Sequence, residues 1–165
     1  MNDKMIIKAD GAELYLERTF AAPRERVWAA FTECQHLTNW WGPKGWDLTH
    51  CDMDFRVGGR WHYCMTGKNP ENGEAIQSWG LADYTAISAP DSYTYIDAFS
   101  NAEGGKVPGM PVSEITMDFV EVDGGTKVLS RGVYASAEEL ETIMEMGVEQ
   151  GITETWDRLE ELLAK

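Results

Sequence analysis

The chain has 165 residues, of which 43% are hydrophobic and 25% are charged, and seven are tryptophan. Acidic residues outnumber basic ones by 28 to 14, and the resulting net charge of −14 disfavours binding to phosphate backbones and to anionic membrane surfaces. The sequence has neither a signal-peptide pattern nor an apolar run of the roughly 20 residues that cross a membrane. We therefore expect a cytoplasmic protein with no nucleic-acid partner and no membrane partner.

The length of the chain predicts one domain, residues 1–165. Within it, residues 1–12 are expected to be a loosely ordered N-terminal segment. The cysteines are Cys34, Cys51 and Cys64, an odd number without the spacing of a disulfide framework. This usage is typical of a reducing compartment.

The first predicted elements are a strand and a helix. In ELYLERTF, residues 13–20, the apolar side chains alternate onto one face, which indicates a strand, and Arg18 falls on that same face. In APRERVWAAFTE, which follows, Pro23 suits a first helical turn and the apolar residues recur at helical spacings. A short helix is therefore predicted after the first strand.

The middle of the chain alternates extended segments with turn residues. After a Gly-Pro break, strands are predicted at 46–55, 59–66, 76–87, 92–100, 112–122 and 126–134. The segment VDGGT predicts a tight hairpin between the last two. With a long helix at the end of the chain, this order indicates the α+β fold class.

The last predicted element is one long helix from Ser136 to about Leu163, with Ser136 as its cap and Glu139 completing a capping box. Inside it, Gly147 and Gly151 lie one turn apart on the apolar stripe. Each glycine in a helix costs roughly 1 kcal/mol relative to alanine. Two explanations remain open: the small residues let the helix pack closely on the sheet, or they leave a cavity between helix and sheet.

Four segments of the chain resemble one known superfamily. They are APRERVWAAFTECQHLTNWWGPKGWD, DFRVGGRW, VDGGTKV and EMGVEQGITETWDRLEELL, which occur in the family's order between about Glu13 and Leu163. The chain is similar to the START-like helix-grip (SRPBCC) superfamily, in the branch of homologues of the activator of heat-shock protein 90 ATPase. The resemblance implies a curved antiparallel sheet of about six or seven strands wrapped around a long C-terminal helix, with two short helices after the first strand. It also implies an apolar pocket between sheet and helix, which agrees with inward-facing glycines.

Strand parity predicts which side chains face this pocket. In GGRWHYCMTG and DSYTYIDAFS the faces that carry the larger aromatic residues are expected to point inward. The tryptophans around the Gly-Pro turn are expected to close one mouth of the pocket, and residues 100–111 the other. The predicted ligand-binding residues are Trp40, Trp41, Trp46, Trp61, Tyr63, Met65, Tyr95, Asp97, Phe99, Met117, Met144, Gly147 and Gly151. Arg18 and Asp97 are either polar groups of the pocket or members of structural ion pairs, with each other or with neighbours.

The sequence also contains residues that could form a metal site or a catalytic site. His50, Asp52, His62 and Cys64 are expected on the outer face of a hairpin and are residue types that bind zinc. No C-x-x-C or H-E-x-x-H pattern accompanies them, so solvated strand residues are the preferred interpretation, and neither a metal nor another cofactor is predicted. For catalysis the candidate is Asp97, because an acid in an aromatic pocket can have a raised pKa and transfer protons.

The sequence thus predicts binding of a small hydrophobic or aromatic molecule, without catalysis. One alternative is a protein-interaction module of the chaperone-activator type. This alternative is weakened because chaperone-activating members of the family carry an additional N-terminal domain. The other is a cyclase- or hydrolase-like enzyme that uses a pocket carboxylate. The oligomeric state, monomer or homodimer, is left open.

Overall fold

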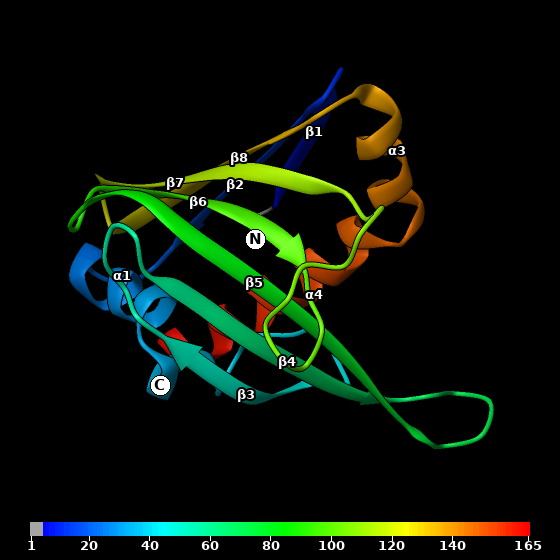
Figure 1. Cartoon of the computed structure of the whole chain (residues 1–165). Coiled ribbons are helices and arrows are strands. Elements are labelled where there is room, and N and C mark those ends of the chain that lie inside the picture. The colour runs from blue at the N-terminus through cyan, green and yellow to red at the C-terminus, as the bar shows by residue number, and fades with distance from the viewer. Residues whose placement is uncertain (1–4) are drawn as a thin grey trace.

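The computed structural model describes residues 5–165 (Figure 1). Its strands are β1 (Ile6–Asp10), β2 (Glu13–Phe20), β3 (Asp47–Met53), β4 (Arg60–Lys68), β5 (Ala75–Ser88), β6 (Ser92–Phe99), β7 (Val112–Val122) and β8 (Gly125–Tyr134). Its helices are α1 (Arg24–Thr32), α2 (Cys34–Leu37), α3 (Ala137–Glu145) and α4 (Val148–Leu163).

The strands form one antiparallel sheet in the order β1-β2-β8-β7-β6-β5-β4-β3. This architecture confirms the α+β helix-grip class, with eight strands where six or seven were expected. The unexpected strand is β1, which pairs with β2 so that Ile7 lies opposite Leu16. The expectation of a loosely ordered segment over residues 1–12 is therefore wrong for Ile6–Asp10, while residues 1–4 lie outside the described part of the chain.

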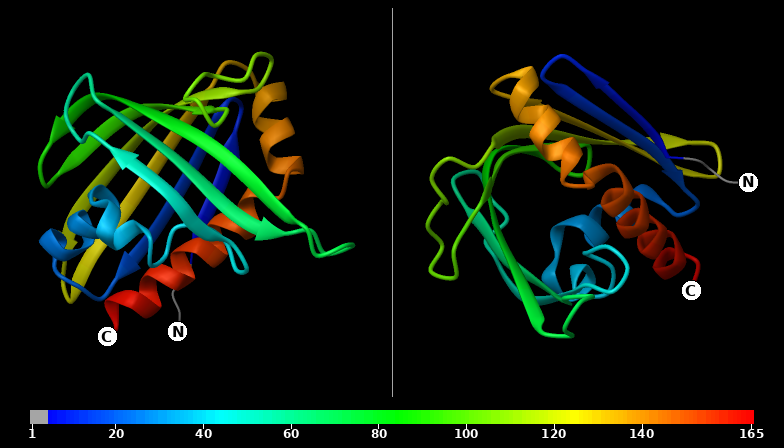
Figure 2. Two further views of the ribbon diagram at one scale, coloured as in Figure 1. Left: turned by 60° about the horizontal axis from the view of Figure 1, so that its bottom comes forward. Right: turned by 90° about the vertical axis from the view of Figure 1, so that its right-hand side faces the viewer.

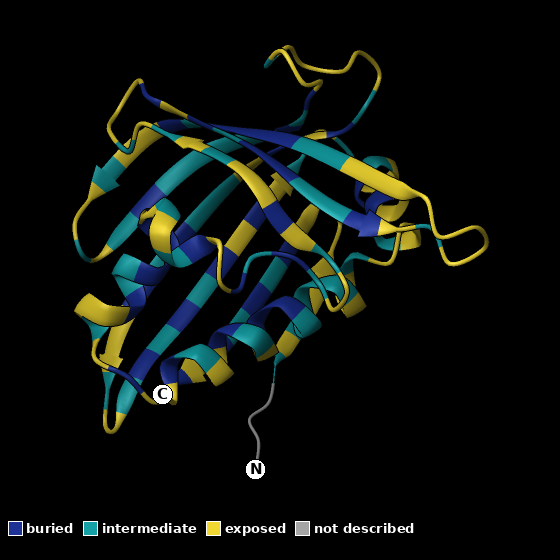
Figure 3. Cartoon of the chain, turned by 90° about the horizontal axis from the view of Figure 1, so that it is seen from below, coloured by how far each residue is buried: buried dark blue, intermediate teal, exposed yellow. Residues whose placement is uncertain are grey.

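The sheet curves around α4 and buries its concave face. Figure 2 shows α4 lying across the open side of the curved sheet, with α1 and α2 near one end of it. Burial alternates along the strands (Figure 3), as in β2, where Leu14, Leu16, Arg18 and Phe20 are buried and the residues between them are not. Because successive side chains of a strand point to opposite faces, one face of the sheet supplies the core.

One end of the space between sheet and helix is filled by aromatic side chains. The ring of Phe31 on α1 lies 4.9 Å from that of Trp40, 5.2 Å from that of Phe119 and 6.1 Å from that of Trp156. Trp40 is fully buried, and its indole N–H donates to the Ala30 carbonyl at 3.0 Å. Edge-to-face contacts of this kind add stability beyond the area that they bury, so this end is solid core.

The C-terminal helix is interrupted, and the prediction of one continuous helix is wrong. Gly147, between α3 and α4, has a φ of +86°, in the left-handed region that ends a right-handed helix and that glycine adopts at little cost. The predicted cap at Ser136 is confirmed, because its hydroxyl accepts a hydrogen bond from the Glu139 N–H at 3.1 Å. The break turns α4 onto the concave face of the sheet (Figure 2), while α3 lies against β2 and β8.

Candidate functional site

A cavity of about 290 Å³ lies between the concave face of the sheet, α4 and the loop before β3. Its walls come from β2, β4, β5, β6, β7, β8, α4 and Phe31 of α1, and Trp41, Gly42 and Pro43 border it from the loop. A smaller space of about 230 Å³ adjoins it and shares Tyr63, Asp97 and other wall residues with it. Most of the lining side chains are aliphatic or aromatic, which is the composition of small-molecule sites.

The structure brings many of the predicted ligand-binding residues to this cavity. Its lining includes Trp41, Trp61, Tyr63, Met65, Tyr95, Asp97, Met117 and Gly151. Phe99 lines the smaller space, because it lies further along β6 toward Pro111. Whether these side chains contact a ligand stays a prediction.

Four of the predicted residues lie elsewhere, each for a structural reason. Trp40 belongs to the solid core described above. The Trp46 ring covers the backbone of Gly67, where a Cβ atom would meet it at 2.5 Å. Gly147 is exposed at the break between the helices, and Met144 lies before that break on α3. The broken helix takes both away from the cavity, since the stripe that was expected to carry them is not continuous.

Gly151 leaves open space between α4 and the sheet, which is one of the two explanations considered for both glycines. It lies inside α4 and lines the cavity, and a Cβ atom built on it would come no closer than 4.0 Å to Pro43. The space in front of Gly151 is therefore open, which favours the cavity explanation at this position. At Gly147 a glycine is favoured for another reason, because the backbone there is in the left-handed region.

Sequence reasoning missed several residues of the lining. They include Tyr84 on β5, Tyr134 on β8, and Val148 and Ile152 on α4. The alternation of β8 could have identified Tyr134, because it lies an even number of residues from Val128 and Ser130 and so shares their face of the strand. Val148 and Ile152 are one turn apart, but their face could be identified only from where α4 begins.

Asp97 is the charged side chain in this lining, and its environment alters its acidity. Asp97 is half-buried as a residue and lines both hollow spaces. Burial raises the pKa of Asp97 to about 7 from a usual 3.8, and a hydrogen bond with the Tyr63 hydroxyl counteracts part of the rise. The group therefore exchanges its proton near neutral pH.

Several tyrosines line the cavity, and three of them, Tyr63, Tyr95 and Tyr134, lie near this carboxyl. Burial raises the pKa of Tyr63, Tyr93 and Tyr95 well above 10, and the neighbouring Asp97 charge adds to the rise for Tyr63 and Tyr95. Burial also raises the pKa of Tyr134. These hydroxyls stay neutral at physiological pH, so they can exchange hydrogen bonds with a bound molecule but cannot balance a charge.

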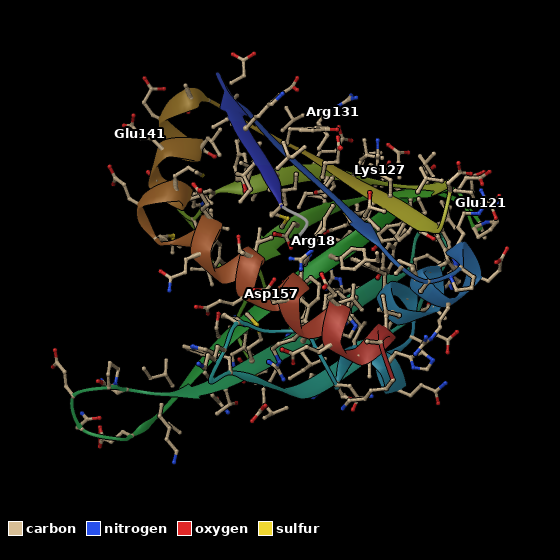
Figure 4. All side chains as sticks on the ribbon, turned by 180° about the vertical axis from the view of Figure 1, so that it is seen from behind. Arg18, Glu121, Lys127, Arg131, Glu141 and Asp157 are labelled. Atoms are coloured by element: carbon tan, nitrogen blue, oxygen red, sulfur yellow. A yellow bond between two sulfur atoms is a disulfide. The ribbon has the colours of Figure 1, made fainter. Side chains whose placement is uncertain are left out.

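Arg18 does not face the cavity. Its guanidinium turns to α4, where Nη1 lies 2.7 Å from Asp157 and Nη2 bonds Glu160 (Figure 4). Of the two roles considered for Arg18, the structure shows the ion pair, with partners on α4 and not with Asp97. No ion pair within residues 5–165 involves Asp97.

The loop between α2 and β3, which borders the cavity, is held by bonds on two sides. A disulfide joins Cys34 on α2 to Cys51 on β3, although the cysteines do not have the spacing of a disulfide framework and their usage was interpreted as that of a reducing compartment. The spacing of the cysteines in the sequence could not show this bond, because the two sulfur atoms meet only once the chain has folded and α2 lies against β3. On the other side, Arg158 of α4 donates to the Gly42 carbonyl at 2.9 Å and to the Trp46 carbonyl at 2.7 Å.

The outer-face histidines contact one another and a tryptophan. The His50 and His62 rings lie 5.4 Å apart, and His62 stacks on Trp79 at 5.0 Å. His62 Nε2 is 3.0 Å from the Asn101 carbonyl oxygen, and Cys64 is buried. Across residues 5–165, no three side chains of His, Cys, Asp or Glu come together as metal ligands.

The family model described as Activator of Hsp90 ATPase homolog 1-like protein matches residues 21–164. The chain belongs to this family. Among solved structures it is similar to a Mycobacterium smegmatis protein, with 34% identity, 97% of each chain covered and a TM-score of 0.86. A Staphylococcus epidermidis protein is 31% identical, with 97% of this chain and 94% of that chain covered and a TM-score of 0.79. An Arthrobacter aurescens protein is 28% identical, with 96% and 91% covered and a TM-score of 0.83.

The search of curated proteins gave no match. Membership of the Activator of Hsp90 ATPase homolog 1-like family therefore identifies the fold and leaves the ligand to be argued from the cavity. Among the described helices, none combines the length and the hydrophobicity that a membrane crossing requires.

Proposed function

We propose that the protein binds a small, mainly hydrophobic molecule in the cavity between the sheet and α4. The observation that supports this is a hollow of about 290 Å³ in a fold whose neighbouring end is tightly filled. Protein interiors are normally packed without voids larger than a water molecule, so a space of this size calls for an explanation beyond folding.

The walls favour an aromatic or alicyclic ligand. Trp61 and Tyr63 stack with their ring centroids 4.2 Å apart, and Tyr93 and Tyr95 stack at 5.8 Å, so flat faces are available on β4 and β6. Ile152 on α4 supplies an aliphatic wall. A few polar groups, chiefly Asp97 and the tyrosine hydroxyls, would orient the ligand.

The alternative of a chaperone-binding module has its support in the name of the family. In contrast to the cavity, no observation within residues 5–165 identifies a surface for such a partner. The experiment below separates the two roles, because filling an internal space leaves the outer surface unchanged.

The test is a pair of substitutions at one position. Gly151→Leu should fill part of the cavity and reduce the uptake of a hydrophobic fluorescent probe such as N-phenyl-1-naphthylamine at least tenfold. Gly151→Ala is the matched control, because it brings the same gain in helix propensity with a single methyl group. Probe binding that is equal in the wild type and in a folded Gly151→Leu variant would overturn the proposal.

Native mass spectrometry of the purified protein provides a second, independent test. A ligand that co-purifies should add a few hundred daltons, and the added mass should disappear on denaturation. The Gly151→Leu variant should carry less of it than the Gly151→Ala variant.

A further inference from the structure

Asp97 occupies a position in the cavity that an organic cation would fit. It lies on β6, between Ala82 of β5 and Ser113 of β7 in the register of the sheet, and so on an interior strand. From there it faces both the larger and the smaller space. A ligand in either space can therefore place a polar group near this carboxyl.

Within residues 5–165, the carboxylate has no counter-charge. Arg18, the buried arginine of the sheet, is paired with Asp157 and Glu160. Arg60 and Lys106 pair with Asp83. No lysine, arginine or histidine is among the described residues that line either space. A buried charge without a partner is costly, and a cation in the ligand would remove that cost.

The groups that face Asp97 add electron-rich rings and no positive charge. The ionisable ones are Tyr63 on β4, Tyr95 on β6 and Tyr134 on β8, and Tyr84 on β5 also lines the larger space. All are neutral at physiological pH, since burial raises the pKa of each further above the usual 10. From α4, the lining residues carry no ionisable group. Cations are attracted to the faces of aromatic rings, most strongly where water is excluded.

We infer that the ligand is a hydrophobic amine or quaternary ammonium compound, whose positive nitrogen pairs with Asp97 while its apolar part lies among the aromatic walls. This inference rests on the proposed function and names the chemical class of its ligand. Charge neutralisation and cation–ring contact act on the same nitrogen, so the two effects favour the same orientation of the ligand.

The inference predicts how binding depends on pH. The pKa of Asp97 is about 7, so its ionised fraction falls about tenfold between pH 8 and pH 6. Binding of a cation should weaken by about the same factor over that range. A quaternary ammonium probe keeps its own charge at every pH. A change of its affinity with pH would therefore report the ionisation of a group in the protein.

The experiment compares two probes of one shape, (2-naphthylmethyl)trimethylammonium and its uncharged isostere 2-neopentylnaphthalene, titrated into the full chain by NMR. At pH 8 the cation should bind at least tenfold more tightly than the isostere, and at pH 6 this preference should be largely lost. Asp97→Asn should remove the preference at both pH values, because the amide carries no charge. Glu114→Gln, which removes an exposed acid of β7, is the matched control and should keep the preference.

The outcomes separate this inference from the proposed function. Equal affinities for the two probes, unaffected by Asp97→Asn, would overturn the cation inference and leave hydrophobic binding in place. Tighter binding of the isostere than of the cation would also overturn the cation inference and leave hydrophobic binding in place, since Asp97 would then act as a neutral acid. Failure of both probes to bind at either pH would overturn both proposals.

Discussion

Arg18 on β2 and Asp157 on α4 form an ion pair that fastens the helix to the sheet. The distance from Arg18 Nη1 to Asp157 Oδ1 is 2.7 Å, and Nη2 bonds Glu160 one turn further along α4 (Figure 4). Arg18 is 7% exposed, whereas the two acids are 55% and 52% exposed. The arginine thus carries a charge into the core from the inner face of a strand, and its partners remain hydrated.

Replacing Arg18 should destabilise the protein. Arg18→Met keeps the aliphatic stem and removes hydrogen bonds to charged groups, each worth about 1.5–3 kcal/mol when buried. Because both acids stay in water, we expect a total loss of about 2 kcal/mol in the free energy of unfolding, measured in urea. The control is Arg56→Met, which breaks an exposed pair with Asp54 and should cost less than about 0.5 kcal/mol. Equal effects of the two substitutions would contradict the role given to Arg18.

The disulfide should contribute stability that reduction removes. Cys34 and Cys51 are separated by 17 positions, and closing a loop of that length is worth about 3 kcal/mol in the chain-entropy model. The midpoint of urea unfolding should therefore fall when dithiothreitol is added. In a Cys34→Ser, Cys51→Ser variant the reductant should have no effect, which controls for the free Cys64. An unchanged midpoint in the wild type would contradict the prediction.

The sequence predicted the strands of the sheet more successfully than the contacts between segments that are far apart in the chain. Period-two alternation located β2, and the turn residues between extended segments located β3 through β8 to within a few residues. Strand β1 was missed since Ile6–Asp10 is mostly exposed and has no such pattern. The disulfide and the Arg18 pair were not predictable in detail, because both join segments that only the fold brings together.

Asp97 should make stability depend on pH in an identifiable way. Its folded pKa of about 7 lies above the unfolded value near 3.8, so the native state holds the proton more tightly than the unfolded state. The contribution of Asp97 to the free energy of unfolding therefore falls as the pH rises from about 4 to about 7. Asp97→Asn, which stays neutral, should match the wild type near pH 4 and be more stable at pH 8, by at most about 4 kcal/mol.

The measurement is the difference in free energy of unfolding between Asp97→Asn and the wild type across pH 4–8. Taking the difference removes the contributions of the other acids, which titrate in both proteins. A difference that does not change with pH would show that Asp97 has an ordinary pKa and is hydrated.

Gly147 and Gly151 should respond in opposite directions to the same substitution. Gly147 has a φ of +86°, where an alanine costs roughly 1–2 kcal/mol. Gly151 is inside α4, and a methyl group there meets nothing closer than Pro43 at 4.0 Å. Gly147→Ala should therefore lower the free energy of unfolding, while Gly151→Ala should raise it by up to about 1 kcal/mol. If the helix were continuous, both substitutions would stabilise, so a stabilising Gly147→Ala would contradict the break between α3 and α4.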